Sequence, residues 1–322
     1  MREIHLSPLS AVAPEALHLG SPQQEENDIT LQLFSPKDVL EDFEARFPKV
    51  FELFARVGIH PTKALPVMNP YTGEIETEDF TNIGEHCVAV AYAASKIMEA
   101  LVQADVVEQS DADYVIERAL VHDLNKPYEI MRRKAMGPDV PKEVYSESAY
   151  EKLEPLLLEM GISEEMVAYL VTAGKETGHN SLKDFIALGE GGVTGIVEGR
   201  IAEKVVHLAD DMTFTSTPTK EGQEPVTAFL TPKERIYASG FIEKYLWMWK
   251  EGLGVDESGT ICEVADVNSP EDGITPLGNY ANLQVQVAQA IARELMLNLG
   301  VTNRNPAIFI RDLIRGENQP IQ

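Results

Sequence analysis

An adjacent histidine and aspartate, His122 and Asp123 in the segment ALVHDLNKP, are the residues whose types and spacing are best suited to chemistry. Another histidine, His86, lies upstream in GEHCVAVAYAA, and a further aspartate, Asp210, lies downstream in KVVHLADDM. Two imidazole nitrogens and two carboxylates suit a divalent metal ion, and such a set leaves coordination positions open for water or a substrate. The predicted chemistry is that of an ion which activates a water and polarises a phosphoryl oxygen.

Helices are expected to position all of these residues. Apolar side chains recur at intervals of three and four over residues 87–101, which predicts a helix that has one apolar face and carries the upstream histidine. A second predicted helix, over about 111–124, delivers the His-Asp pair at its end, and Pro127 stops it. The downstream aspartate lies near the end of a third, over about 194–213. Because one helix presents only one or two ligands inward at one height, several helices are needed to assemble the set.

The order His86, His122-Asp123, Asp210 resembles the H…HD…D signature of the HD superfamily. HDLNK is similar to that superfamily's HD-x-x-K segment, HLADDM is similar to its terminal L-A-D motif, and the resemblance covers roughly residues 78–215. It implies an all-α fold, an HD-domain-like helical bundle, with these four residues holding a divalent metal ion. The implied activity is metal-dependent hydrolysis of a phosphate ester, usually in a nucleotide or nucleotide-like substrate. The pattern does not distinguish Mn, Co, Ni, Fe, Mg and Zn.

Nearby residues are candidates for roles in this reaction. Asp123 could orient the attacking water as both ligand and base. Lys126 lies four residues after His122, one helical turn on if the helix continues, where it could pair with a phosphate and steady the developing charge. Arg132 and Arg133 belong to the densest basic run and could guide an anionic substrate, the alternative being a solvated helix face.

A further set of candidates lies between the His-Asp pair and the last aspartate. His179, in GKETGHNSL, falls where bimetallic HD proteins carry additional histidines, but it lacks their paired-histidine context, so one metal ion is favoured over two. Glu176 lies one turn before His179 if the segment is helical, and the adjacent Lys175 could contact a phosphate. His207, three residues before Asp210, could support that ligand from outside the coordination shell, and a capping or surface role is the alternative.

The remainder of the chain is also predicted to be mainly helical. Residues 1–33 lack periodicity and are expected to form an N-terminal arm, flexible or packed on a partner. Residues 34–228 would form the HD-type helical domain, and residues 229–322 a C-terminal helical extension, either separate or part of the same core. Further helices are predicted at about 35–54 with an interruption at Pro48, 141–160, 163–175, 231–252, 276–299 and 305–314, and a short hairpin at about 258–267.

Composition limits the partners. The 322 residues include 27 Lys and Arg against 52 Asp and Glu, a formal net charge of −25. Such a surface repels phosphodiester backbones and anionic membranes, so no nucleic acid polymer is expected, whereas a small anionic substrate remains compatible with a local cluster of metal, Lys and Arg. No apolar stretch approaches the roughly 20 residues of a membrane helix. With only two cysteines, we expect a reduced, cytoplasmic protein. A homo-oligomer remains open.

Two other functions are compatible with the same residues. Some HD-fold proteins use a diiron pair to oxidise C–H bonds, and these need more ligands, which here only Glu176, His179 or His207 could supply. A non-catalytic HD protein that binds a nucleotide or a partner is the other alternative. Metal stoichiometry separates the first from a phosphohydrolase, and stabilisation by a ligand without product formation would indicate the second.

Overall fold

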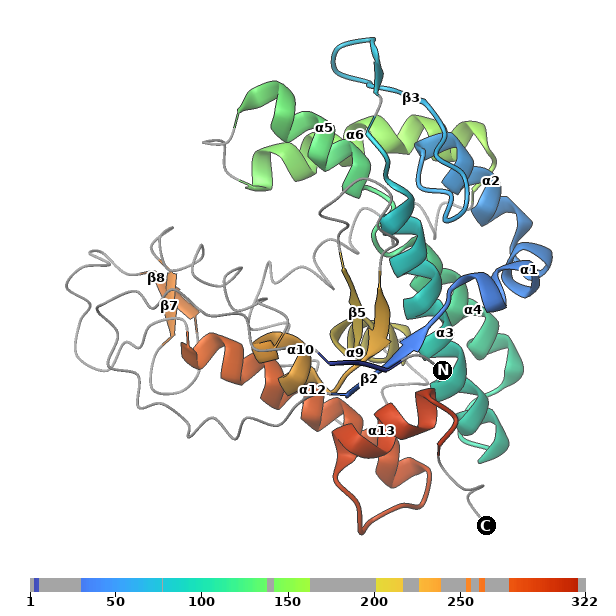
Figure 1. Cartoon of the computed structure of the whole chain (residues 1–322), viewed down its shortest axis with the longest axis vertical. Helices are drawn as coiled ribbons and strands as arrows, with labels where there is room; N and C mark the ends of the chain where they lie inside the picture. The colour runs from blue at the N-terminus through green and yellow to red at the C-terminus, as the bar shows by residue number, and fades with distance from the viewer. Residues whose placement is uncertain are drawn as a thin grey trace.

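Of the 322 residues, the computed structural model describes 3–5, 30–76, 78–137, 142–162, 201–216, 226–238, 253–255, 261–263 and 278–317. Most of these residues are helical (Figure 1). The helices are α1 (Lys37–Arg46), α2 (Pro48–Val57), α3 (Thr81–Gln103), α4 (Gln109–Val121), α5 (Lys126–Met136), α6 (Lys142–Glu159), α9 (Ile201–Met212), α10 (Pro232–Ala238), α12 (Gly278–Asn298) and α13 (Pro306–Ile314). Within the described ranges, no helix combines the length and the apolar run that crossing a membrane requires.

Short strands accompany the helices, so the fold is predominantly but not entirely helical. They are β1 (Glu3–His5), β2 (Thr30–Phe34), β3 (Val67–Met68), β4 (Ile75–Glu76), β5 (Thr213–Thr215), β6 (Thr227–Phe229), β7 (Leu253–Val255) and β8 (Ile261–Glu263). Four of them form an antiparallel sheet in the order β1-β2-β6-β5, and β3-β4 and β7-β8 are hairpins. The sequence prediction of an all-helical bundle missed the four-stranded sheet, because strands of three to five residues are too short to show alternation.

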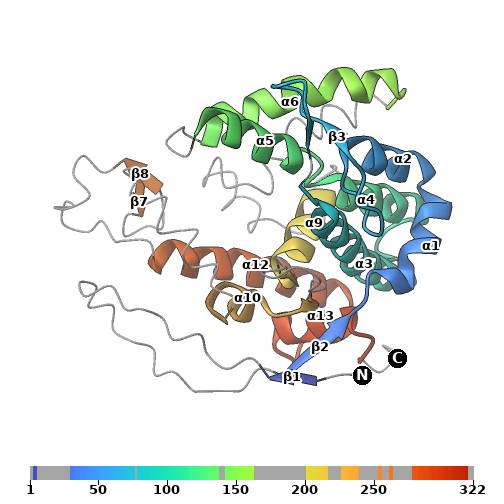
Figure 2. The ribbon, with the colours of Figure 1, turned by 45° about the horizontal axis from the view of Figure 1, so that its top comes forward.

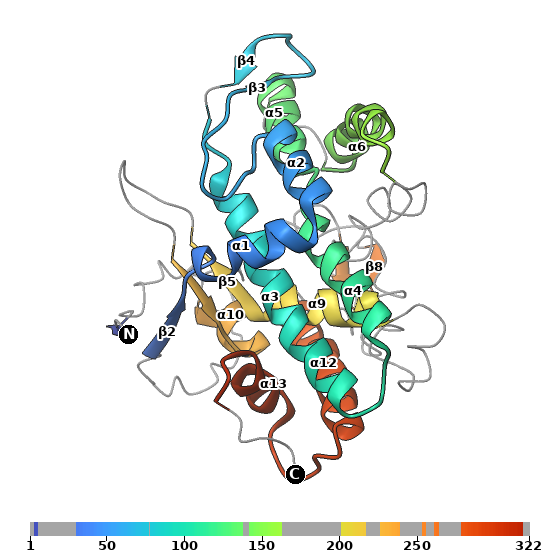
Figure 3. The ribbon, with the colours of Figure 1, turned by 90° about the vertical axis from the view of Figure 1, so that its right-hand side faces the viewer.

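Helix α3 forms the centre of the core and runs through the middle of the view in Figure 3. Its buried face is rich in alanine, which lets α4 and α9 approach closely. Gly84 in its first turn marks the tightest approach, because a Cβ there would lie 1.7 Å from the backbone oxygen of Ile59. Only glycine fits this position, and the loop after α2 is thereby held against the start of α3.

Two prolines divide the helical segments in different ways. Pro48 begins α2 directly after Phe47, which confirms the predicted interruption of the first helical segment. Pro127 does more than stop a helix: α4 already ends at Val121, and Pro127 lies in the first turn of α5, where its missing N–H costs nothing. The helix therefore does not continue from His122 into the next turn, and α5 is an element that the sequence analysis did not predict.

The C-terminal helices pack on the same buried cluster as α3. Ile291 and Leu295 of α12 and Phe309 and Ile310 of α13 belong to it. The predicted helices at about 276–299 and 305–314 are confirmed as α12 and α13, and the described part of the one at 231–252 is α10. The helix predicted at 163–175 lies outside the described residues. The hairpin predicted at about 258–267 is present slightly earlier, as β7-β8.

The sheet is joined to α3 by an aromatic cluster. Phe34 of β2 stacks on Tyr92 of α3 with a centroid distance of 4.6 Å, and Phe229 of β6 lies 5.0 Å from Phe34 and 5.7 Å from Tyr92. Residues 3–5 and 30–33, within the segment expected to be an arm, thus take part in this sheet, as β1 and as all of β2 except its last residue. In Figure 2 the α5-α6 pair lies on the opposite side of the molecule from α12 and α13. Between them lie α3, α4 and α9.

Candidate metal centre

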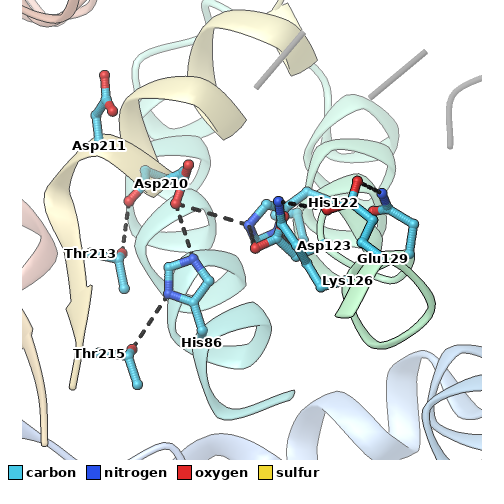
Figure 4. Close-up of polar contacts among 12 residues, drawn as sticks. His86, His122, Asp123, Lys126, Glu129, Asp210, Asp211, Thr213 and Thr215 are labelled. Carbon is cyan, nitrogen blue, oxygen red and sulfur yellow. Dashed lines mark hydrogen bonds and ion pairs between the residues drawn. The ribbon is translucent and has the colours of Figure 1, made fainter. Parts of the chain in front are cut away.

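The two histidines and two aspartates singled out in the sequence meet at the junction of α3, α4 and α9 (Figure 4). His86 projects from the second turn of α3, and Asp210 from the last turn of α9. His122 and Asp123 occupy the turn directly after α4. These three helices contact one another pairwise, so helix packing places His86 and Asp210 directly and also places the turn at the end of α4 that carries His122 and Asp123.

The distances within the cluster suit a single ion. His86 Nε2 lies 3.0 Å from Asp210 Oδ1, and His122 Nε2 lies 4.0 Å from the same oxygen and 3.8 Å from Asp123 Oδ2. Ligand atoms of His86, His122 and Asp123 all lie within 4.8 Å of one another. Two atoms that each bind one ion at about 2.1 Å are roughly 3 to 4 Å apart. The distances from Asp210 Oδ1 to the two histidines and from His122 to Asp123 fall in about this range, but the group whose ligand atoms all lie within 4.8 Å of one another does not include Asp210.

His122 is oriented for this role by the backbone. Its Nδ1 donates to the carbonyl oxygen of Ala119 at 2.7 Å, which directs Nε2 toward the carboxylates. The side chain is 2% exposed, and Nε2 has no hydrogen-bond partner within the part of the chain that the structure describes. Burial disfavours a charged imidazole, but the Asp123 and Asp210 carboxylates and the Cys87 thiol raise its pKa to about 9. Nε2 is thus placed to hold either a proton or a metal ion.

His86 is held from its other side by the sheet. Its Nδ1 lies 3.4 Å from Thr215 Oγ1 of β5, and that hydroxyl lies 3.2 Å from Thr227 Oγ1 of β6. The sequence analysis missed both threonines. β5 directly follows the helix of Asp210 and brings Thr215 back past the start of α3, and a strand of three residues leaves no alternating pattern by which to find it in the sequence.

Neighbouring cations lower the pKa of both carboxyls, although burial acts to raise it. Burial opposes ionisation of Asp210, but the Arg235 guanidinium and the two histidines hold the pKa of its carboxyl well below the usual range. Burial acts in the same direction on Asp123, and there Lys126 and the histidines outweigh it and lower the pKa. Two carboxyls whose ionised form is favoured, placed beside two imidazole nitrogens, are the electrostatic setting in which a divalent cation binds.

What the site can do follows from this donor set. Two imidazole nitrogens and two carboxylate oxygens suit a divalent ion of borderline to hard character and leave positions for water or a substrate oxygen. The chain matches no known protein family, curated protein or solved structure. The chemistry of the site is therefore inferred from its own geometry.

Lys126 is the cation at the edge of the ligand set. Its Nζ lies 3.8 Å from Asp123 Oδ1 and 3.4 Å from Glu129 Oε2, and the Asp123 carboxylate raises its pKa further above the ordinary value. Glu129 in turn accepts a hydrogen bond from Asn125 Nδ2 at 2.8 Å. The side chain of Lys126 is 35% exposed, so a charged ammonium faces solvent next to a ligand. It reaches this position from the start of α5 and not from a continuation of α4.

His207 and its neighbour Asp211 lie beside the cluster but face away from it. His207 Nε2 lies 3.1 Å from Asp211 Oδ2, so its partner is this aspartate and not Asp210. Both side chains are buried, which excludes the alternative of a surface role for His207. Asp211 points away from the two histidines in Figure 4. The link from this pair to Asp210 is Arg235, whose guanidinium contacts both aspartates and which the sequence analysis missed.

The other predicted contacts lie elsewhere. Arg132 has its guanidinium carbon 5.0 Å from the centroid of the Tyr71 ring in the β3-β4 hairpin, and Arg133 is exposed in the last turn of α5. Within the described ranges, neither forms a hydrogen bond or ion pair with the four clustered residues. Lys175, Glu176 and His179 lie outside the described residues.

Proposed function

We propose that this chain is an HD-type helical protein whose residues His86, His122, Asp123 and Asp210 bind one divalent metal ion. The observation that carries the proposal is the state of His122 Nε2, which is buried between two carboxylates with its orientation set by the opposite ring nitrogen. A buried polar atom without a partner costs about 1–3 kcal/mol, and a metal ion at this position removes that cost.

We further propose that the activity is hydrolysis of a phosphate ester in a small anionic substrate, of the nucleotide or nucleotide-like class. A divalent ion at the site would polarise a phosphoryl oxygen and make a water more nucleophilic. Asp123 has a second carboxylate oxygen for orienting the attacking water, and the partly exposed ammonium of Lys126 supplies positive charge where a phosphate would lie. The net charge of −25 favours a small substrate over a nucleic acid polymer.

Elemental analysis of the purified protein, prepared without chelator, tests the metal site. Wild type should contain about one divalent ion per chain, and His122→Ala and Asp210→Asn should lose it. Asp113→Asn is a matched control, because this aspartate is 54% exposed on α4 and, among the described residues, is contacted by Arg46 and Gln109 and by none of the four proposed ligands. Wild type that takes up no manganese, cobalt, nickel, iron or zinc would contradict the proposal.

A screen of phosphorylated metabolites with the metal-loaded protein tests the activity. Release of inorganic phosphate should depend on the metal and should disappear in a folded His122→Ala variant. Full activity in that variant would contradict the role assigned to the site. Two irons per chain would instead favour the oxygenase alternative, and ligand-induced stabilisation without any product would favour a binding protein.

A further inference from the structure

Arg235 of α10 joins the candidate metal centre to the C-terminal helices. Its Nη2 donates to Asp210 Oδ1 at 3.3 Å, and its Nη1 donates to Asp211 Oδ1 at 3.1 Å. The residue is 7% exposed, so these contacts form away from bulk solvent, where charge-assisted hydrogen bonds are strongest. Adjacent carboxylates would repel each other, and one guanidinium placed between them reduces this repulsion.

The far end of this arrangement is itself held in place. Asp211 Oδ1 also accepts a hydrogen bond from Gln284 Nε2 of α12 at 3.2 Å, and Asp211 Oδ2 lies 3.1 Å from His207 Nε2. Oδ1 of Asp211 thus accepts hydrogen bonds from Arg235 and Gln284 while Oδ2 faces His207, and Asp210 is the member of the pair that faces His86 and His122. Asp211 serves to anchor Arg235.

Helix α10 is anchored independently of the aspartates. The backbone N–H of Thr231 donates to Glu234 Oε2 at 2.7 Å, and the N–H of Glu234 donates to Thr231 Oγ1 at 3.3 Å, an N-terminal capping box. Arg311 of α13 then donates to Glu234 Oε1 at 3.3 Å. The position of Arg235 is thus set by α12 and α13, elements that contribute none of the four proposed ligands.

We propose that Arg235 is a positioning residue of the metal centre, which holds the Asp210 carboxylate toward His86 and His122 before an ion arrives. The inference rests on the proposed metal-binding function. Asp210 Oδ1 receives the Arg235 contact and also lies 3.0 Å from His86 Nε2, and a carboxylate oxygen has lone pairs enough for a donor and a metal at once.

Two effects of Arg235 on metal affinity have opposite signs. The Arg235 guanidinium, with one nitrogen on each aspartate, holds the Asp210 carboxylate in place. The Asp210 side chain therefore loses less conformational entropy when a metal ion binds. The positive charge of Arg235 repels the cation. We expect the positioning effect to be the larger one. Asp211, 3.1 Å from Arg235, offsets part of the positive charge. Among the described residues of the C-terminal elements, Arg235 alone donates a hydrogen bond to Asp210. Loss of the two guanidinium contacts should therefore weaken metal binding.

The test is titration of the metal-free full-length protein with Co²⁺, followed by its visible absorption spectrum, which reports coordination number and geometry. Arg235→Gln should raise the dissociation constant by about 10- to 100-fold and shift the absorption band. Arg235→Lys keeps the charge without the two guanidinium contacts and should show a smaller rise. Since Arg235→Gln leaves Asp211 without its cation, the double variant Arg235→Gln/Asp211→Asn removes both charges and should bind Co²⁺ as weakly as the single variant.

Arg46→Gln is the control, because Arg46 of α1 pairs with Asp42 and Asp113 and contacts neither Arg235 nor Asp210 in the described part of the chain. It removes a surface arginine without disturbing α10 and should leave the dissociation constant and the spectrum unchanged. Arg235 variants that bind Co²⁺ with wild-type or tighter affinity and an unchanged spectrum would overturn the inference while the metal site stands. Wild type that binds no Co²⁺ would overturn the proposed function together with it.

Discussion

His86 Nε2 lies 3.0 Å from Asp210 Oδ1, although 124 positions of the chain separate the two residues. The contact exists because the start of α3 packs against the end of α9, and the turn after α4 adds His122 and Asp123 beside it. A site built in this way is sensitive to helix packing, to the groups that orient each ligand and to the charges at its edge. Each of these can be tested separately.

Replacement of Thr215 by valine should weaken metal binding without unfolding the protein. The change removes the hydroxyl next to His86 Nδ1 and keeps the size and β-branching of the side chain. Lost orientation of a ligand histidine should raise the metal dissociation constant by about 10-fold. Isothermal titration with Mn²⁺ or Co²⁺ measures it. Thr227→Val, which removes only the partner of Thr215, should have a smaller effect, and equal effects would contradict direct support of His86.

Alanine at Gly84 should destabilise the fold, against the usual trend for helices. In an exposed helix interior a Gly→Ala change is favourable by about 1 kcal/mol. Here the new Cβ would lie 1.7 Å from the Ile59 oxygen, so α3 or the loop must move, at a cost of roughly 3 kcal/mol or more. Urea denaturation measures the free energy of unfolding. Asn82→Ala, in the same turn, is the control and should change it by less than about 1 kcal/mol.

The buried ion pair between α9 and α12 should behave asymmetrically under mutation. Lys204 Nζ lies 2.6 Å from Glu294 Oε2, and the Lys204 side chain is almost fully buried. Lys204→Met leaves a carboxylate without its cation and should lower the free energy of unfolding by about 3–5 kcal/mol. The double variant Lys204→Met/Glu294→Leu should recover most of that loss in the same urea titration. If the losses instead add, the pair is not the source of the effect.

Lys126 should matter for turnover and not for metal content. Lys126→Met removes the ammonium beside Asp123, and phosphate release by the metal-loaded protein should fall by about 10²- to 10³-fold. The metal content by elemental analysis should stay at the wild-type value. Arg133→Ala, at an exposed position of the same helix, should leave turnover unchanged. An equal loss of turnover in Arg133→Ala would contradict a specific role for Lys126 and would indicate a general effect of positive charge on α5.

Much of the helical framework and the four clustered residues could be predicted from the sequence, because their signals are local. Apolar periodicity, capping residues and proline positions act within a few residues, and they located α1, α2, α3, α4, α12 and α13. The adjacent His122 and Asp123 can likewise be recognised directly in the amino-acid sequence. Pro127 shows the limit of such reasoning, because a proline that ends one helix is equally suited to begin another.

What only the tertiary structure decided is which distant groups touch the four residues. Thr215 reaches His86 through a sheet whose strands are too short to leave an alternating pattern, and Arg235 reaches Asp210 because α12 and α13 fix α10. Neither contact leaves a pattern in the sequence. The residues next to an arginine in the chain do not show whether its side chain faces a buried carboxylate or water. The candidate ligands could be identified from the sequence because their chemistry depends on residue type. The residues that orient them, Thr215 and Arg235, could not be identified in this way, because their contacts depend on long-range packing.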